Sequence, residues 1–372
     1  HKPFHWFSEF YAIMARGGFD AIIGNPPYVE YSKVRREYSI SDYETESCGN
    51  LYAYVIERCF DTLCHNGRMG MIVQLPIVCT DRMKPLQQQC LDRSTNIWFA
   101  NFDDRPSRLF DGLQHIRATI FTCQKGTSVP YLVYSTSYNR WYSEFRPQLF
   151  EMLSFAYVSP YLVAGAIPKI GHVDSKRIWE RIANFSALLK AMPGQAHGDM
   201  VYFHNAPQYW VRAMDFIPYF WNERDGEQIS TQVKTLRLQS DLDAAIVVAA
   251  LNSSLFYWWF IILSDCRHLN MREIENFPLG LDTMKESEKS CLAKLTLELM
   301  ADFKRHKIRR ECQYKTTGKV VYDEFYPRLS KPIIDEIDKV LAKHYGFTDE
   351  ELDFIINYDI KYRMGIDGDK EE

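Results

Sequence analysis

The chain has 372 residues, of which 46% are hydrophobic and 25% are charged. This composition is that of an ordinary globular protein, and the length is enough for two domains and a C-terminal extension. Its 44 Lys and Arg against 48 Asp and Glu give a formal net charge of −4. That balance excludes a uniformly basic nucleic-acid binder but allows a local basic patch, because a polyanion responds to the local field.

The N-terminal third alternates β-rich runs with amphipathic runs, which predicts a wound α/β sheet. We predict buried strands at 19–23, 68–75, 96–102 and 117–123, and helices at 51–64 and 84–91. In the first helix, Tyr54, Val55, Cys59 and Leu63 form one apolar stripe. The polar segment 103–114 separates the last two strands and is long enough to be a functional loop.

From about residue 131 the chain is rich in aromatic residues, Pro and Gly, which predicts a second domain of mixed strands and loops. The last part is helical, with helices at 290–304 and 330–344, the second capped by Gly346. The run 244–264 has no charged side chain and is long enough to cross a bilayer. Asn252-Ser253-Ser254 lies at its centre, so we predict one buried core helix and no membrane contact.

The nine cysteines are scattered, and no two form a Cys-x-x-Cys pair. An odd number without such spacing favours a reducing, cytoplasmic compartment over disulfides or structural zinc. The ten His residues also lack metal-ligand spacing, so no metal site is predicted.

One motif points to a specific chemistry: Asn25-Pro26-Pro27-Tyr28 directly follows the strand predicted at 19–23. The exocyclic amine of adenine is a poor nucleophile because its lone pair is delocalised into the ring. Two acceptors, the Asn25 side-chain oxygen and the Pro26 carbonyl, would favour the tetrahedral nitrogen that can attack a sulfonium methyl group. Tyr28 offers a face on which a flipped-out base can stack. The alternative is a plain turn that ends the strand.

This motif and its surroundings resemble a known family, the amino-group DNA methyltransferases, specifically N6-adenine enzymes with a following target-recognition domain. The resemblance starts in the block Gly17–Val29 and continues through Asn50–Ala53 and Gly67–Val73. Segments 251–258, 272–278 and 349–363 are similar to the recognition domain and C-terminal end of type IIG restriction-modification enzymes. The resemblance implies the C-terminal half of a Rossmann-like methyltransferase sheet (1–130), an α+β target-recognition domain (131–282) and a helical C-terminal region (283–372).

The same resemblance implies transfer of a methyl group from S-adenosylmethionine to the N6 of a flipped-out adenine in double-stranded DNA, in a restriction-modification or phage-defence protein. Asn25, Pro26, Pro27 and Tyr28 would be the catalytic residues. Phe110 stands where the family holds a second aromatic ring against the flipped base, although a loop anchor would explain it equally well.

The chain departs from the family at the cofactor motif. The family binds S-adenosylmethionine at a Gly-x-Gly turn, where the cofactor approaches the backbone closely. No two of the 18 glycines here are separated by a single residue. We therefore expect the first three strands of the sheet to lie upstream of His1, and this chain alone to be inactive. The strand at 19–23 would then present an unpaired edge, through which the protein could associate with itself.

Cations suggest where DNA would bind. Lys33, Arg35 and Arg36 follow the catalytic motif, and a loop there could clamp DNA beside the extruded base. Seven cations lie between Lys304 and Lys319, and Lys304 and Arg305 begin this run as candidates for phosphate contacts, although such runs are usually solvated helix faces. Further candidates in the recognition domain are Tyr209, Trp210, Arg212, Lys234 and Arg237.

Three readings remain open at this level. The first is the DNA adenine methyltransferase, and the second is a DNA-binding specificity module without activity of its own. The third keeps the methyl chemistry but changes the substrate to RNA or a protein glutamine, which the large aromatic second domain disfavours. A nuclease within these residues is not expected, because the acidic cluster at 335–339 fits an amphipathic helix.

Overall fold

The computed structural model describes residues 4–112, 115–127, 132–163, 165–188, 199–315 and 317–365. The chain divides into two compact units, and Ser175 is the last residue of the N-terminal unit. The C-terminal unit begins at Lys176, within helix α6 (Val173–Ile182). Because a compact unit has its own core, each unit is described by itself.

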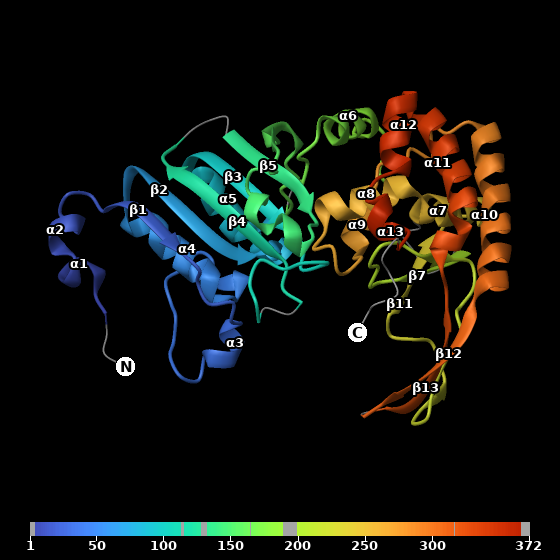
Figure 1. Cartoon of the computed structure of the whole chain (residues 1–372), viewed down its shortest axis with the longest axis horizontal. Helices are drawn as coiled ribbons and strands as arrows, with labels where there is room; N and C mark the ends of the chain where they lie inside the picture. The colour runs from blue at the N-terminus through green and yellow to red at the C-terminus, as the bar shows by residue number, and fades with distance from the viewer. Residues whose placement is uncertain are drawn as a thin grey trace. The chain divides into compact units, whose positions relative to one another are not determined.

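The N-terminal unit is built on a six-stranded mixed sheet with the order β1-β2-β4-β3-β5-β6 (Figure 1). Its strands are β1 (Phe19–Gly24), β2 (Leu63–Gln74), β3 (Ser94–Phe102), β4 (Ala118–Lys125), β5 (Leu132–Asn139) and β6 (Phe155–Tyr157). Its helices are α1 (Trp6–Glu9), α2 (Tyr11–Met14), α3 (Tyr31–Val34), α4 (Leu51–Thr62) and α5 (Lys84–Asp92). The predicted α/β class and the four predicted strands are confirmed.

The strand directions put the ends of four strands at one edge of this sheet. β1 pairs parallel with β2, and β3 pairs parallel with β5. β4 lies between β2 and β3 and is antiparallel to both, so β1, β2, β3 and β5 all run in the same direction. Loops that follow these four strands therefore meet at one carboxyl edge, where open α/β sheets bind their ligands.

The predicted end of helix α4 is wrong. The helix ends at Thr62 instead of residue 64, because Leu63 is already extended and begins β2. Tyr52, Ile56 and Phe60 are fully buried. Of the predicted stripe, Tyr54 and Leu63 are also buried, whereas Val55 and Cys59 are half-buried.

The boundary of the N-terminal unit differs from the predicted one near residue 130. β5 and β6 lie beyond that position and complete the sheet, so the unit extends to Ser175. Parallel pairing of β5 with β3 joins segments far apart in the sequence, which local composition does not reveal. The predicted second boundary near residue 282 likewise falls inside one compact unit.

Strand β1 is the edge strand of the sheet, in agreement with the predicted unpaired edge. It is therefore not the buried strand that its apolar sequence predicts, and the Ile23 side chain is 87% exposed. β1 and the outer face of α4 line an open cavity of about 880 Å³. Its walls are mostly apolar and include Trp6, Phe19, Ile22, Tyr54 and Val55. This unit thus leaves apolar surface open beside its edge strand.

The C-terminal unit combines a helical core with two small antiparallel sheets (Figure 1). Its helices are α7 (Asp241–Asn252), α8 (Ser254–Leu263), α9 (Met271–Glu275), α10 (Glu286–His306), α11 (Lys331–Tyr345), α12 (Asp349–Ile356) and α13 (Ile360–Arg363). One sheet has the order β11-β7-β8, from β7 (Asp199–His204), β8 (Ala213–Met214) and β11 (Val233–Leu238). The other has the order β10-β9-β13-β12, from β9 (Phe220–Asn222), β10 (Gly226–Glu227), β12 (Ile308–Tyr314) and β13 (Gly318–Glu324). The predicted helical end and the Gly346 cap are confirmed.

The apolar run at 244–264 forms two helices instead of the single predicted one. α7 and α8 meet at an angle of 67°. Ser253 causes the break, because its backbone is extended and its side chain accepts a hydrogen bond from Phe256 N as the N-cap of α8. Both helices are buried, as predicted. No single helix of the described residues is long and apolar enough to cross a membrane; α7 and α8 reach that length and composition only as a bent pair.

Asn252, the last residue of α7, should be a main anchor of this helical core. It is buried, and its Nδ2 donates to Ala213 O and Val248 O, each at 2.8 Å. Its Oδ1 accepts from Ala213 N at 3.3 Å. Asn252→Ala leaves buried backbone groups without partners, so we predict a loss of about 2–4 kcal/mol in the free energy of unfolding, measured by urea denaturation.

The matched control is Asn276→Ala. Asn276 is exposed and its Nδ2 donates to Arg272 O at 2.8 Å within one helical turn, so its loss should cost less than about 0.5 kcal/mol. Equal effects of the two substitutions would contradict the anchoring role of Asn252.

Candidate active site at the carboxyl edge of the sheet

The Asn25-Pro26-Pro27-Tyr28 motif lies at the carboxyl end of β1, as the sequence predicts. Pro26 is buried, whereas Asn25 and Pro27 are exposed and Tyr28 is half-buried. Because the proline ring fixes the backbone torsion at Pro26, the direction of the carbonyl is constrained. Because Asn25 is exposed, its side chain and the backbone beside it are accessible at the sheet edge.

Tyr28 is held in one orientation by two contacts. Its hydroxyl donates to Ile72 O of the neighbouring strand β2 at 2.9 Å. Its ring meets the ring of Tyr52 edge-on, with 6.4 Å between the centroids. Burial raises the pKa of Tyr28 to about 12, so the hydroxyl remains a donor at neutral pH. One ring face can then serve as a fixed platform beside Asn25.

The chain just after the motif is fastened to the start of helix α4. Glu30 and Asn50 form a β-bridge, in which Tyr31 N donates to Gly49 O at 2.8 Å and Leu51 N donates to Val29 O at 2.9 Å. Asn50 also caps α4, since its side chain accepts from Tyr52 N. The motif is thus held from both ends, by β1 before it and by this bridge after it.

Glu30 and Arg82 are site residues that sequence reasoning missed. Arg82 Nη2 lies 2.5 Å from Glu30 Oε2, and Asn50 Nδ2 donates to Glu30 Oε1 at 3.3 Å. Arg82 also packs over Gly49, whose φ of +61° favours glycine and where a Cβ atom would meet the guanidinium. The two charges are 52 residues apart, so no local pattern could have paired them.

A second polar cluster lies at the same edge, where β3 and β5 end. Asp103 and Arg140 are both buried, and Arg140 Nε donates to Asp103 Oδ2 at 2.8 Å. Arg117 Nε lies 3.4 Å from Asp103 Oδ1 and donates to the Tyr138 hydroxyl at 2.7 Å. Burial alone would raise the pKa of Asp103, but the charges of Arg140 and Arg117 outweigh it and lower the pKa. This cluster fixes both ends of the polar loop between β3 and β4.

Phe110 belongs to that loop and is half-buried. Among the described residues no ring contact joins Phe110 to Tyr28, so the predicted pair does not form a closed aromatic clamp here. The preceding residue, Leu109, packs on a core cluster of Ala100, Phe102, Trp141 and Leu149. Leu109 is therefore the residue that anchors the loop, the role that the alternative gave to Phe110. The stacking role of Phe110 stays a prediction.

The three cations that follow the motif are accessible. Lys33 lies in the short helix α3, and Arg35 and Arg36 follow it directly. All three side chains are exposed, and no ion pair within the described residues holds any of them. The three residues lie in α3 or directly after it, and α3 projects from the sheet (Figure 1). Their position is that of a loop able to contact a polyanion.

The predicted recognition residues of the C-terminal unit have different environments. Lys234 and Arg237 are exposed on β11, an edge strand. Tyr209 is half-buried and makes contacts of its own. Trp210 is half-buried: its Nε1 donates to Arg363 O at 2.8 Å, and the Arg363 guanidinium lies 4.1 Å from its ring centroid, while its contact with DNA stays a prediction.

The basic run that begins at Lys304 spans the end of α10 and the β12–β13 hairpin, where most of its cations are neutralised. Lys307 and Arg309 lie 2.7 and 2.6 Å from Asp323. Arg310 lies 2.7 Å from Glu324, and Lys319 lies 2.7 Å from Glu311. The predicted contacts Lys304 and Arg305 are both exposed, and Arg305 is 3.9 Å from Asp302. The run is therefore not a uniform positive surface, because acids of β12 and β13 pair with its cations.

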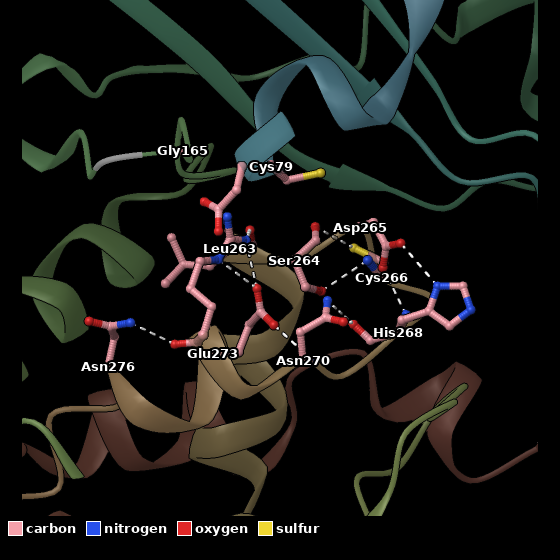
Figure 2. A network of polar contacts seen from close by, with 12 residues as sticks. Cys79, Gly165, Leu263, Ser264, Asp265, Cys266, His268, Asn270, Glu273 and Asn276 are labelled. Atoms are coloured by element: carbon pink, nitrogen blue, oxygen red, sulfur yellow. Dashed lines mark hydrogen bonds and ion pairs between the residues drawn. The ribbon is translucent and has the colours of Figure 1, made fainter. Parts of the chain in front are cut away.

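The segment 272–278, which carries part of the family resemblance, fastens α8 to α9 (Figure 2). Arg272 Nη2 donates to Leu263 O at 3.1 Å and contacts Glu273 Oε1 at 2.6 Å. Glu273 is buried and also accepts from Asn270 N at 3.0 Å. In the preceding turn, Asp265 accepts backbone hydrogen bonds that order the chain (Figure 2). These residues are engaged in packing their own unit.

The glycine nearest to the motif does not offer a cradle for S-adenosylmethionine. Gly24 is the glycine nearest to the motif, and the sulfur of Met71 lies 3.2 Å from where its Cβ would be, so side-chain packing fills that space. No Gly-x-Gly turn occurs in the chain. The groups that the edge does present, Asn25, Pro26 and Tyr28, suit a planar amine-bearing base.

Comparison with known proteins gives one family match. Residues 1–106 match the model of the Eco57I restriction-modification methylases. No protein with a curated description matches the chain.

Solved structures of restriction-modification enzymes are similar at low identity. A type IIL enzyme, MmeI in complex with DNA, is 11% identical over 92% of this chain and 57% of that one, with a TM-score of 0.46. The type IIG restriction endonuclease BpuSI is 9% identical over 91% and 54%, with a TM-score of 0.33. The type ISP enzyme LlaBIII bound to DNA is 11% identical over 85% and 33%, with a TM-score of 0.39. This chain thus spans little more than half of these proteins, or less.

The buried ion pair of Asp103 should make the N-terminal unit sensitive to acid. Since its pKa is lowered on folding, its stabilisation is fully present above the ordinary carboxyl pKa of about 4 and is lost as the pH falls further. We predict that Asp103→Asn lowers the free energy of unfolding by about 3 kcal/mol at neutral pH and flattens the decline of stability below about pH 4. Denaturation curves between neutral pH and about pH 2 measure both effects.

Asp81→Asn is the control for this prediction. Asp81 is exposed and lies 3.1 Å from Lys84, so its loss should cost under about 1 kcal/mol. An unchanged acid response of Asp103→Asn would refute the proposed weight of the buried pair.

Proposed function

We propose that this chain carries the target-base side of a site-specific DNA methyltransferase that modifies the N6 of adenine in duplex DNA, within a restriction-modification or phage-defence protein. The observation that carries the proposal is the position of Asn25-Pro26-Pro27-Tyr28 at the carboxyl edge of a parallel pair of strands. The match of residues 1–106 to a restriction-modification methylase model supports it. S-adenosylmethionine is the proposed methyl donor.

In this proposal Asn25 and Pro26 act on the amine of a flipped-out adenine. The Asn25 side-chain oxygen and the Pro26 carbonyl accept hydrogen bonds from the two N6 hydrogens, which draws the nitrogen lone pair out of the ring. An amine held in this way would be placed to take a methyl group from a sulfonium donor, which would leave as the neutral thioether, and to give up one N6 proton to solvent. S-adenosylmethionine supplies the methyl group as a good electrophile, and the residues here only hold and activate the base.

Tyr28 and Phe110 are the proposed base platforms. The hydrogen bond from Tyr28 to Ile72 O and the edge contact with Tyr52 fix the Tyr28 ring before a base arrives, which lowers the entropic cost of stacking. Phe110 lies in the loop after β3, at the same edge as β1, and would close on the other face of the base. Lys33, Arg35 and Arg36 would contact phosphates beside it.

The most direct variant is Asn25→Ala in the full-length protein that contains this chain. Because it removes one preorganised acceptor at the reacting amine, we predict a fall in methyl transfer of at least about 100-fold. Duplex DNA affinity should change by less than about threefold, since Asn25 does not contact the DNA backbone. Labelled-methyl transfer to DNA and fluorescence anisotropy measure the two quantities.

Two variants of Tyr28 provide matched controls. Tyr28→Phe keeps the ring and loses only the bond to Ile72 O, so it should retain most activity. Tyr28→Ala loses base stacking worth about 1–3 kcal/mol and should lower transfer by about 10- to 100-fold. Full methyl-transfer activity of Asn25→Ala would contradict the methyltransferase proposal.

A DNA-binding specificity module without activity is the alternative function. It is favoured if the full-length protein binds duplex DNA but transfers no methyl group, with Asn25→Ala indistinguishable from the wild type. Two observations favour this alternative: β1 is an edge strand, and the chain has no Gly-x-Gly turn.

Self-association through β1 stays a prediction. The strand has free backbone groups on its outer side and an exposed Ile23, so a second copy could pair with it across a two-fold axis. We predict that Ile23→Lys, which places a charge on that edge, shifts any dimer of this chain towards monomer in sedimentation experiments. A dimer of unchanged affinity would exclude β1 as its interface.

A further inference from the structure

Arg212 is an unusual cation in the C-terminal unit, because it is partly enclosed and forms no ion pair within the described residues. It stands just before β8, and its guanidinium lies 5.2 Å from the ring centroid of the buried Phe325. Its Nε is shielded from solvent and, within the described residues, has no hydrogen-bond partner. Burial lowers the pKa of Arg212 to about 10, so the group is still charged at neutral pH. A charge held in this way costs free energy unless a ligand compensates it.

A second cation lies on the same group of rings. The Phe216 and Phe325 rings are 6.0 Å apart, and the Nζ of Lys304 lies 4.5 Å from the Phe216 centroid. Lys304 is exposed at the end of α10, and no carboxylate within the described part of the chain pairs with it. The rings thus form an apolar floor that bears Arg212 at one side and Lys304 at the other.

The charge of Glu324 acts on Arg212, but among the described residues no acid forms an ion pair with either cation. The Glu324 carboxylate accepts from Arg310 Nε at 2.7 Å and from the Tyr326 hydroxyl. Asp302 accepts from Ser330 Oγ at 2.6 Å. Asp215 is exposed, and among the described residues no ion pair joins it to either cation.

His204 is uncharged and so does not change the charge of this site. It ends β7, and its backbone N donates to Arg212 O at 3.0 Å. Burial and the charge of Arg212 lower the pKa of His204 to about 4, so the imidazole is neutral at physiological pH. The ring floor therefore bears two cations that form no ion pair within the described residues, in contrast to the paired cations of the β12–β13 hairpin.

We propose that Arg212 and Lys304, set on the Phe216–Phe325 floor, form an anion site that binds a phosphodiester group of the nucleic-acid backbone. The guanidinium supplies a planar pair of donors that matches phosphate oxygens, and the ammonium supplies a second point charge. The ring floor excludes water and strengthens both interactions. As a backbone contact, the site would position the DNA and read no bases, and its assignment to DNA rests on the proposed function.

The test measures binding of the full-length protein to a pool of random duplexes of about 30 base pairs as a function of salt concentration. Each phosphate contact adds about 0.9 to the slope of log affinity against log salt concentration. Arg212→Met and Lys304→Met should each weaken binding about tenfold at about 100 mM salt and lower the slope by about 1. The control Lys319→Met, whose cation is paired with Glu311, should change affinity less than about twofold.

The melting temperature separates binding from a structural role. Removing a buried guanidinium that forms no ion pair should leave the melting temperature of Arg212→Met unchanged or raise it, whereas loss of a structural contact would lower it by several degrees. Wild-type affinity and slope in Arg212→Met would overturn the site. A lowered melting temperature with an unchanged slope would also overturn it and assign Arg212 a structural role.

Tripolyphosphate distinguishes failure of this site from failure of the proposed function. It should raise the melting temperature of the wild-type protein and not that of Arg212→Met. If the wild type shows this difference but binds no duplex, the anion site stands and the DNA function falls. If tripolyphosphate stabilises both proteins equally, the anion site falls, whatever the DNA result.

Discussion

The parallel pairing of β1 with β2 is the constraint on which the candidate active site depends. It places Gly24 opposite Met71 and so brings Asn25 to the carboxyl edge beside the end of β2. The hydrogen bond from Tyr28 to Ile72 O crosses between the same two segments and fixes the motif to β2. Within the described sheet β1 pairs with no other strand. The position of the motif therefore depends on the pairing of β1 with β2 and on the bridge from Glu30 to Asn50.

Paired charges organise the rest of that edge. Asp103 is compensated by two arginines from different strands, which holds the long loop after β3 at both ends. Glu30 and Arg82 do the same for the segment after the motif. Arg212 in the C-terminal unit differs, because its Nε is buried without a hydrogen-bond partner among the described residues. Structural cations are paired where they stand, and a cation left unpaired is a reasonable place to expect a ligand.

The sequence predicted what depends on neighbours along the chain. The β-rich runs located four strands of the first sheet, and the order of Asn, Pro and Tyr after an apolar strand located the motif. What it could not predict depends on contacts across the chain. The pairing of β5 with β3 moved the unit boundary to Ser175, and Arg363 occupied the Trp210 ring from 153 residues away. The bend at Ser253 has a local cause, the serine N-cap of α8, but the run around it has no charged residue to mark a break.

The central claim is that the carboxyl edge of this sheet presents the amine of an adenine for methylation. The most direct measurement is mass spectrometry of nucleosides from DNA of a host that lacks adenine methylation and makes the full-length protein. The account predicts N6-methyldeoxyadenosine in the wild type and its loss with Asn25→Ala. N4-methyldeoxycytidine in place of the adenine product, or N6-methyldeoxyadenosine that persists in Asn25→Ala, would contradict it.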